Sequence, residues 1–347
     1  MILPLSLSWL VTIVIAAFAV RALITRADRW GLVDTANERS LHSGSTPRSG
    51  GLGILVAIAC GWVLGAVMGY SATHWLSLSL AGVALAGVSL LDDLRDISPL
   101  PRFAVHLLAG ATPTLAGDGL GDLAVPGATL ELGFALSFAL TTVFVVWSIN
   151  LYNFMDGMDG FAAGMTFLGF GFLALLGVMD GRVAFALTCA VISASATGFL
   201  LFNFPPARVF MGDAGAATLG FLAAACILWA DAAGIAPLWI GVMIFSPFFL
   251  DATITVIRRA LSRERIWQAH RTHYYQRAVQ AGWSHRRTVL VEYALMIGCG
   301  VTALWIVNTA VWVQWSAIAV WLAIYSLCMG FVHMRELSSG ESSSASR

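Results

Sequence analysis

The sequence has 347 residues, of which 59% are hydrophobic and 11% are charged, and its formal net charge is zero. A mean hydropathy of +0.82 excludes a soluble globular domain and indicates an integral membrane protein. The balanced charge provides no general attraction to nucleic acid, so we expect no nucleic-acid partner.

Apolar runs recur along the chain, each about 17 to 24 residues long, which is enough for a helix to cross a bilayer. The short alternating segments typical of membrane barrels are missing from the sequence. We therefore predict an all-α, polytopic integral membrane protein with about eleven transmembrane helices. The expected spans lie near 3–24, 51–70, 74–91, 103–116, 133–150, 160–178, 183–202, 214–230, 234–257, 289–308 and 311–332.

The first span predicts an uncleaved membrane anchor. The segment Ala17–Ala19 resembles a signal-peptide cleavage site, but no basic residue precedes it, and the first one is Arg21. The chain contains no lysine, so its 19 basic residues are all arginine. When the N-terminus is placed in the periplasm, only Arg182 falls clearly outside, and the arginine-bearing loops face the cytosol. This orientation satisfies the positive-inside rule.

The chain is expected to form one transmembrane catalytic domain, 1–336, with a disordered cytosolic tail, 337–347, that is rich in serine. The five cysteines all lie within the apolar spans, and their spacing indicates neither a disulfide framework nor a metal site. Polar residues, by contrast, gather in five short clusters, and each cluster falls on the predicted cytosolic side.

The first cluster is Thr46-Pro47-Arg48, which is followed by two glycines and precedes the second span. An arginine beside exposed backbone N–H groups suits a phosphate. The alternative is an arginine at the membrane interface, where a loop enters a helix. Both interpretations are open from the residues alone.

The second cluster places three acids within five residues, Asp92, Asp93 and Asp96, a short distance before Arg102. Clustered carboxylates repel one another and are best tolerated beside a cation such as Mg²⁺ or a basic partner that holds phosphate. An acidic helix end that marks topology is the alternative, but acids contribute little to topology. The cluster therefore favours a functional role.

The third cluster contains Asn153, Asp156 and Asp159. Because these residues are three apart, a helical turn would align them on one face. Amide and carboxylate oxygens flanked by glycines suit Mg²⁺ and a diphosphate. A glycine-rich break between helices is the alternative, but it does not explain the choice of Asn and Asp.

The fourth cluster is Gly212-Asp213 at the start of the eighth span, shortly after Phe210. A helix N-terminus attracts anions, and an acid there can bind a metal or serve simply as an N-cap. Phe210 is either a core residue or a stacking partner for a base.

The fifth cluster runs from 258 to 288 and includes Arg258, Arg259, His270 and His273. The histidine pair lacks further ligands for a zinc site. The segment is either an amphipathic helix on the membrane surface or, beside an acidic site, a holder of diphosphate. Acids, amide, histidines and arginines on one side of the membrane indicate phosphoryl transfer with Mg²⁺.

In motif order, from Thr46-Pro47-Arg48 to His270 and His273, the chain resembles the polyprenyl-phosphate N-acetylhexosamine-1-phosphate transferases. The resemblance implies transfer of a hexosamine 1-phosphate from a UDP-sugar to undecaprenyl phosphate, with release of UMP. The implied site residues are Asn153 and Asp213 for Mg²⁺, with Mn²⁺ as an alternative; Asp92, Asp93, Asp156 and Asp159 for catalysis; and Thr46, Arg48, Arg102, Phe210, Arg258, Arg259, His270 and His273 for the substrates.

Two departures narrow the expected substrate. Phospho-MurNAc-pentapeptide transferases carry a lysine where this chain has Asp96, and a run of histidines where it has His-Arg-Thr-His. The chain has no lysine, so the peptidoglycan role is not expected. The late motif also departs from that of the GlcNAc-type enzymes, because Arg271 and Thr272 replace part of it and Arg-Ile-Trp-Gln precedes it. The resemblance therefore points to the O-antigen branch in the bacterial inner membrane, with donors of the GlcNAc, FucNAc or QuiNAc type, and with a homodimer as an option.

Two other classes of protein are open alternatives. A secondary transporter would place its ionisable residues near the bilayer midplane, on broken helices of repeated halves. In this chain the acids lie at the ends of spans, and no repeat is visible. A non-catalytic subunit of a glycan assembly complex is the second alternative, although such a protein gains nothing from clustered acids.

Overall fold

The computed structural model describes residues 2–26, 33–34, 46–70, 73–95, 97–265 and 270–344. Its elements are α1 (Ile2–Ile24), β1 (Val33–Asp34), β2 (Thr46–Pro47), α3 (Gly50–Val67), α4 (His74–Arg95), α5 (Pro99–Ala116), β3 (Asp122–Val125), β4 (Ala128–Glu131), α6 (Phe134–Met155), α7 (Phe161–Met179), α8 (Val183–Asn203), α9 (Asp213–Ala232), α10 (Leu238–Ile244), α11 (Ser246–Leu261), α12 (Tyr274–Gln280), α13 (His285–Ile306) and α14 (Val311–Ser344). The strands form two small antiparallel pairs, β1–β2 and β3–β4. The protein is therefore all-α and polytopic, as predicted.

Within the described residues, nine helices are long and apolar enough to cross a membrane, and the count is ten if the bent pair α10–α11 is one span. The prediction of eleven differs because α5, which contains Arg102 and His106, falls outside this count. Nevertheless α5 runs the full height of α4. His74, at the start of α4, lies 3.1 Å from Asp118, just beyond the end of α5, and Arg102 at the start of α5 pairs with Asp92 near the end of α4.

The predicted span at 234–257 corresponds to the pair α10 and α11, and the two helices meet at an angle of 86°. Pro247 lies in the first turn of α11, and proline cannot donate the backbone hydrogen bond that would continue a helix. The carbonyl of Met243 accepts a hydrogen bond from the Ser246 hydroxyl instead, at 2.7 Å. The break carries α11 away from the direction of α10.

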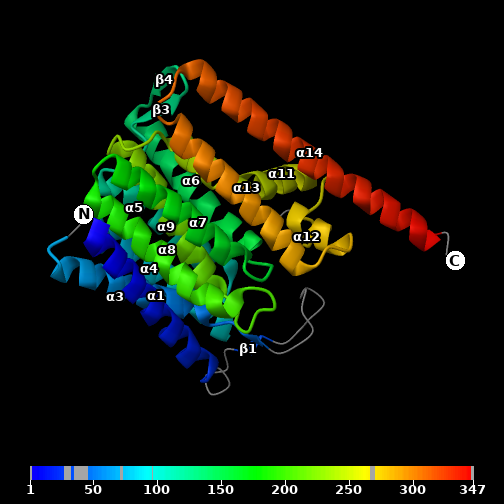
Figure 1. The fold of residues 1–347 in the computed structure, drawn as a ribbon, viewed down its shortest axis with the longest axis horizontal. Helices are drawn as coiled ribbons and strands as arrows, with labels where there is room; N and C mark the ends of the chain where they lie inside the picture. The colour runs from blue at the N-terminus through cyan, green and yellow to red at the C-terminus, as the bar shows by residue number, and fades with distance from the viewer. Residues whose placement is uncertain are drawn as a thin grey trace.

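The core of the bundle is α9, in which 94% of the 18-residue apolar stretch is buried, whereas in the corresponding stretch of α14 only 6% is buried. Helices α3, α4 and α6 pack against α9. Figure 1 shows α14 leaving the bundle beside the β3–β4 hairpin and extending past α12. The backbone helix of α14 continues to Ser344, into the segment predicted as a tail, and 345–347 lie outside the described residues.

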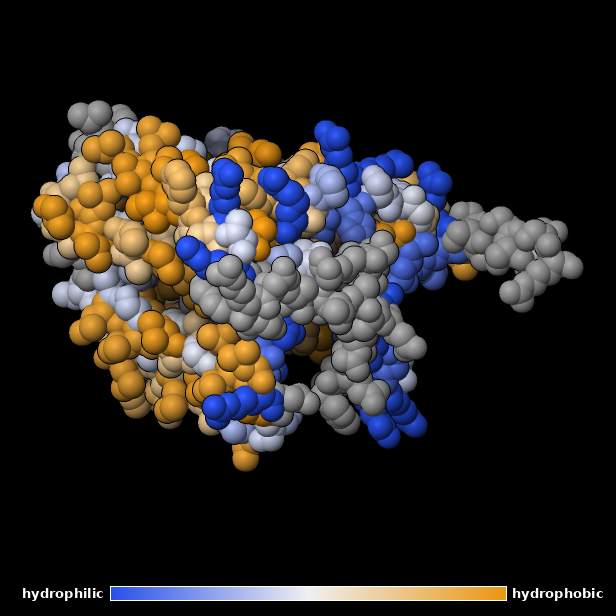
Figure 2. All heavy atoms as spheres, turned by 90° about the horizontal axis from the view of Figure 1, so that it is seen from below, coloured by the Kyte–Doolittle hydropathy of each residue, from blue (hydrophilic) through white to orange (hydrophobic). Residues whose placement is uncertain are grey.

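One end of the bundle collects the polar clusters. The C-terminal ends of α4, α6 and α11 and the N-terminal ends of α3, α5, α9 and α13 meet there. Figure 2 shows hydrophobic side chains over the left part of one face, with hydrophilic side chains gathered towards the right. The clusters that are scattered along the sequence are thus neighbours in space, as expected for a single site at one membrane surface.

Candidate active site

Arg102 lies between two acids that come from different helices. Its Nη1 pairs with Asp92 Oδ2, and its Nη2 lies 3.5 Å from Asp213 Oδ2. Asp213 is also within electrostatic range of Asp92 and Arg48. We call Arg48, Asp92, Asp93, Arg102 and Asp213 the acid–arginine centre. Three acids and two cations from three separate parts of the sequence meet in it, as the cluster analysis predicted.

Arg48 holds the remaining acid of the centre. Its Nη1 lies 3.4 Å from Asp93 Oδ1, and its Nη2 donates a 3.0 Å hydrogen bond to the Asp93 backbone carbonyl. The Arg48 guanidinium is thus directed at Asp93, and this pairing favours a role in the site over that of an isolated arginine at the membrane interface. Thr46 lies in β2, half-buried, just before this arginine.

Backbone contacts join the first and fourth clusters. The Phe210 N–H donates to the Pro47 carbonyl at 2.7 Å, and the Gly50 N–H donates to the Phe210 carbonyl at 3.0 Å. Gly212 has a φ of +76°, and a Cβ there would lie 2.2 Å from the Arg48 carbonyl oxygen, so only glycine fits. Gly212 also occupies the N-cap of α9. The alternative role of Asp213 as an N-cap is therefore wrong, and its carboxylate is left to face Arg102.

The third cluster is divided by the end of α6 at Met155, so its three polar residues do not share one helical face. Asp156 accepts a hydrogen bond from the Gly212 backbone N–H and lies near Asp213. Asp159 instead accepts a 3.0 Å hydrogen bond from the Ala207 N–H and lies 3.8 Å from His285 Nδ1. Asp156 thus belongs beside the acid–arginine centre, whereas Asp159 holds the loop that leads to α9.

Asn153 has the property expected of an unused ligand. Among the described residues no hydrogen-bond partner reaches its buried Oδ1, and a buried amide oxygen without a partner is costly. No group of three or more His, Cys, Asp and Glu in the described chain is arranged to hold a metal. Mg²⁺ commonly takes one or two protein oxygens and completes its shell with water and substrate phosphate. Asn153 and Asp213 fit that incomplete type of site.

The pKa of Asp156 is raised well above its ordinary value, first by burial, then by Asp213 and to a lesser extent by Asp159. The folded protein therefore keeps the Asp156 proton to a higher pH than the unfolded chain does. Wild-type stability should fall as the pH rises from the ordinary carboxyl pKa through the raised one, because folded Asp156 must then ionise against its surroundings.

We expect Asp156→Asn to raise the apparent melting temperature in detergent at pH 8 and to leave it unchanged in acid, because Asn never ionises. An asparagine oxygen can still accept the Gly212 N–H. Thermal unfolding of both proteins at pH 5 and pH 8 checks the sign, and a variant less stable than the wild type at pH 8 contradicts it.

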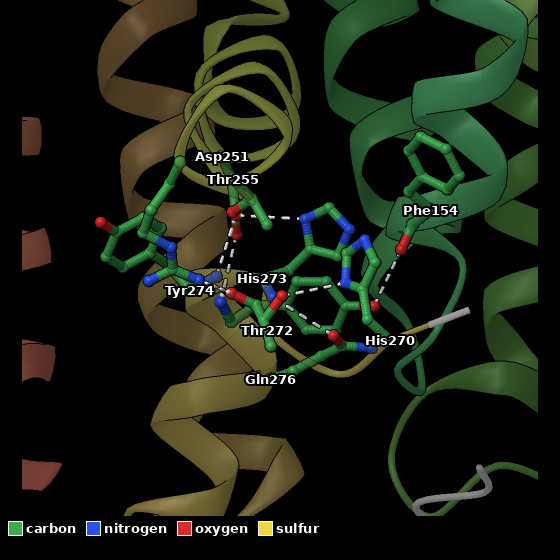
Figure 3. Close-up of polar contacts among 10 residues, drawn as sticks. Phe154, Asp251, Thr255, His270, Thr272, His273, Tyr274 and Gln276 are labelled. Carbon is green, nitrogen blue, oxygen red and sulfur yellow. Dashed lines mark hydrogen bonds and ion pairs between the residues drawn. The ribbon is translucent and has the colours of Figure 1, made fainter. Parts of the chain in front are cut away.

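The fifth cluster forms an aromatic stack against the end of α6. The rings of His270 and His273 lie 4.9 Å apart, and Phe154 lies 5.9 Å from His273 with the two planes 28° apart. The Tyr275 hydroxyl donates a 3.0 Å hydrogen bond to the Phe154 carbonyl. Figure 3 shows both histidine rings between α11 and Phe154. The histidines are thereby brought next to the Asn153–Asp156 segment.

His270 is neutral, although the basic character of this cluster suggests a positive charge. Burial first, and then His273, Arg259 and Arg258, lower the pKa of His270 to about 4. The ring is therefore neutral at physiological pH, with Nδ1 lying 3.0 Å from the Thr272 hydroxyl. In the free protein His270 offers a hydrogen-bonding group to a ligand and no positive charge.

The two arginines of α11 hold the loop that carries the histidines. Arg258 donates a 2.7 Å hydrogen bond to the Thr272 carbonyl. Arg259 is only 7% exposed, lies 2.7 Å from Glu264 and donates to the Arg265 carbonyl at 3.0 Å. These contacts are structural, and the predicted role of both arginines in substrate binding stays a prediction.

Two further polar residues position the site, and the sequence analysis did not select them. Asn203 is 5% exposed; its Oδ1 accepts from the Gly160 N–H at 2.9 Å, and its Nδ2 donates to the Val209 carbonyl at 2.8 Å. Asp251 is buried in α11 and receives hydrogen bonds from the start of α12. The signal for Asp251 was an acid inside a predicted apolar span. Asp96 lies outside the described residues.

Together, the fold and the site define a polytopic membrane protein with a carboxylate, arginine and histidine site at one end of its helices. The family model of glycosyl transferase family 4 matches residues 75–231. The chain is 30% identical over 319 residues to a decaprenyl-phosphate N-acetylglucosaminephosphotransferase of Mycobacterium leprae, covering 83% of this chain and 80% of that one.

Two other relatives are similar over most of their length. A probable undecaprenyl-phosphate N-acetylglucosaminyl 1-phosphate transferase of Bacillus subtilis is 28% identical, with 82% of this chain and 80% of that one covered. A phospho-N-acetylmuramoyl-pentapeptide-transferase of Geobacillus kaustophilus is 28% identical, with 85% and 94% covered. The chain belongs to the family of polyprenyl-phosphate hexosamine-1-phosphate transferases.

Proposed function

We propose that this protein transfers an N-acetylhexosamine 1-phosphate from a UDP-sugar to undecaprenyl phosphate and releases UMP. The observation that carries the proposal is the acid–arginine centre, in which Arg102 joins Asp92 to Asp213 at the end of a membrane bundle. A lipid phosphate at the membrane surface and a soluble sugar nucleotide can both reach such a position. Family membership supports the same reaction class.

The acceptor phosphate is assigned to Arg48 and Arg102, which already face the pair Asp92 and Asp93. Guanidinium groups bind phosphate oxygens in a fixed geometry. Phosphate monoesters have a second pKa of about 6, so the acceptor is largely ionised at neutral pH. Asp92 or Asp93 therefore needs only to orient it or to take a residual proton.

The donor diphosphate is assigned to the side of the site that His270, His273 and Phe154 form. His270 is neutral before the donor arrives, because its pKa is about 4. It therefore contributes hydrogen bonds, whereas the charge on the diphosphate is left to Arg258 and to a metal ion. Phe210, beside the Gly212–Asp213 turn, is assigned to the uracil.

The cation is proposed to be Mg²⁺, with Mn²⁺ as a substitute, held by Asn153 and Asp213. When bound, it neutralises the diphosphate and the charge that develops on the leaving UMP. The unpartnered Oδ1 of Asn153 supports this assignment. The pKa of Asp156 is raised first by burial and then by the nearby carboxylates of Asp213 and Asp159, and a divalent cation would offset the charge of these carboxylates.

The chemical step is a direct attack by the acceptor phosphate oxygen on the β-phosphorus of the UDP-sugar. The new P–O bond forms as the bond to UMP breaks, and UMP leaves with the bonding electron pair. The residue set supports this course over a phospho-Asp intermediate, because Asp92 and Asp93 are each engaged by an arginine. A stable phosphoenzyme formed with UDP-sugar alone would overturn it.

The finer assignments are proposals as well. The donor sugar is of the GlcNAc, FucNAc or QuiNAc type, the product initiates O-antigen or a related surface glycan, and the protein lies in the bacterial inner membrane, with a homodimer as an option. The positive-inside distribution of arginine supports a cytosolic site.

The testing experiment is UMP release by the purified protein with undecaprenyl phosphate, Mg²⁺ and a panel of UDP-N-acetylhexosamines. We expect release that depends on the lipid and stops when EDTA removes the metal. The preferred donor identifies the sugar. Folded protein that releases no UMP from any donor would favour a transporter or a non-catalytic subunit instead.

A further inference from the structure

Asp251 is a buried acid of α11 that the proposed reaction does not use directly. It is 6% exposed, and an ionisable side chain within an apolar span is costly unless it has a role. Its contacts come from the segment that carries the histidines, which lies more than 20 residues further along the chain (Figure 3).

The carboxylate of Asp251 organises the first turn of α12. Oδ1 accepts the Tyr274 N–H at 2.9 Å, and Oδ2 accepts the Tyr275 N–H at 3.1 Å. The Thr255 hydroxyl donates to Oδ1 at 3.1 Å. The first N–H groups of a helix have no partners within the helix. Here a carboxylate from a different helix accepts their hydrogen bonds. The position of His273, just before this turn, is set by the same contacts.

The same carboxylate faces the ring of His273. Asp251 Oδ1 lies 3.4 Å from His273 Nδ1, and the ring is 2% exposed. A buried lone pair directed at a carboxylate is repulsive, whereas an N–H directed at it is attractive. No hydrogen-bond partner among the described residues reaches this Nδ1, so the carboxylate of Asp251 is the anionic group that would stabilise a proton there. Because the two ring nitrogens lie on opposite edges, Nε2 is turned away from Asp251, and Figure 3 shows the ring between Asp251 and Phe154.

The aromatic neighbours of the ring do not select a tautomer, and the competing group is the Gln276 backbone N–H, which the capping box of α12 directs at the His273 side chain. Phe154 and Tyr275 stack on it at 5.9 and 6.0 Å between centroids, and His270 lies 4.9 Å away. Stacking sets the plane of the ring, but it does not distinguish one nitrogen from the other. The charges of Arg258 and Arg259 lie on the His270 side of the cluster. Asp251 is the anion beside Nδ1, and its charge favours a proton on that nitrogen over acceptance from the Gln276 N–H.

We propose that Asp251 is the positioning residue for His273, holding Nδ1–H towards α11 so that Nε2 is the nitrogen presented to the donor. Nε2 of that tautomer is a hydrogen-bond acceptor, so the group of the donor that it would meet is a hydroxyl. The kinetic part of this inference rests on the proposed function, whereas the tautomer itself does not.

The first measurement is ¹⁵N NMR of the histidine rings in the detergent-solubilised full chain, with His273→Gln used to assign the signal. We expect the Nδ1–H form in the wild type and a shift towards Nε2–H in Asp251→Asn, which keeps the side-chain volume and an acceptor oxygen. Far-UV circular dichroism shows whether Asp251→Asn remains folded. An unchanged tautomer in a folded variant overturns the proposal.

The second measurement is the kcat and KM of the same variants for the UDP-sugar. Asp251→Asn should lower kcat/KM roughly 10- to 100-fold, as for other acids that orient a functional histidine. The double variant with His273→Gln should be no worse than His273→Gln alone. Thr253→Val is the matched control, because Thr253 is on the same helix and accepts a hydrogen bond from Trp147; it should retain wild-type kinetics.

If the loss of kcat/KM in the double variant equals the product of the two single-variant losses, Asp251 acts independently of His273 and the proposal is overturned. The two hypotheses fail separately. If Asp251→Asn changes the tautomer of His273 but the wild type turns over no UDP-sugar, the positioning role is supported and the proposed function is contradicted. If the wild type turns over UDP-sugar but Asp251→Asn leaves the tautomer unchanged, the proposed function is supported and the positioning role is contradicted.

Discussion

Replacing Asp213 by Asn is expected to lower kcat about 100- to 1,000-fold, the usual cost of removing one group that stabilises charge in a transition state. Asp213 opens α9, faces Arg102 at 3.5 Å and is one of the two groups proposed to hold the metal. The substitution keeps the shape of the side chain but removes the charge on which a cation would depend. UMP release by purified variant and wild type measures the loss.

Asp180→Asn is the matched control for this substitution. Asp180 also pairs with an arginine, and its side chain is 41% exposed against 48% for Asp213, but it lies at the opposite end of the bundle. It should retain full activity. Binding of Mn²⁺, followed by electron paramagnetic resonance, provides a readout apart from turnover. If Asp213→Asn binds Mn²⁺ as the wild type does, Asp213 is not a metal ligand.

Replacing Arg102 by Met is expected to lower both stability and activity. Arg102 is the cation between Asp92 and Asp213, and without it these acids face each other across a half-buried site. A hydrogen bond to a charged group contributes about 1.5–3 kcal/mol, and partial exposure favours the lower end of this range. Turnover should fall about 100-fold, because the acceptor phosphate loses one of its proposed binding groups.

Divalent cation should partly restore the stability of Arg102→Met. We expect Mg²⁺ to raise the apparent melting temperature of the variant more than that of the wild type, since the ion would offset the uncovered carboxylates. Arg182→Met is the control: Arg182 pairs with Asp180 on an exposed turn, and such pairs contribute little. Equal melting temperatures for wild type and Arg102→Met, with and without Mg²⁺, would contradict an electrostatic role for Arg102.

The positions of the spans and the grouping of the clusters were predictable from the sequence. Crossing a membrane requires a long apolar segment, which is a local property that hydropathy reports directly. The arginine distribution then placed every cluster on one side. The meeting of Arg48, Asp93 and Asp213 in one centre follows from that placement, because residues at the same ends of neighbouring helices have little room to lie far apart.

The roles within the site were decided by tertiary structure. Asp156 and Asp159 are three residues apart, but α6 ends before them and sends one towards Gly212 and the other towards Ala207. His270 looks basic in the sequence, yet burial beside other cations keeps it neutral. The contacts of the two acids and the charge of His270 depend on residues distant in the chain and on the exclusion of water. A local sequence pattern does not reveal these factors.

The sequence by itself determined the class of fold and the membrane-spanning segments, because those depend on composition over stretches of about 20 residues. Only the tertiary structure showed the break between α10 and α11 and the reach of Asp251 across to α12. The angle between two helices and the partner of a buried acid depend on packing between distant segments, and the same packing brings His270 and His273 against Phe154.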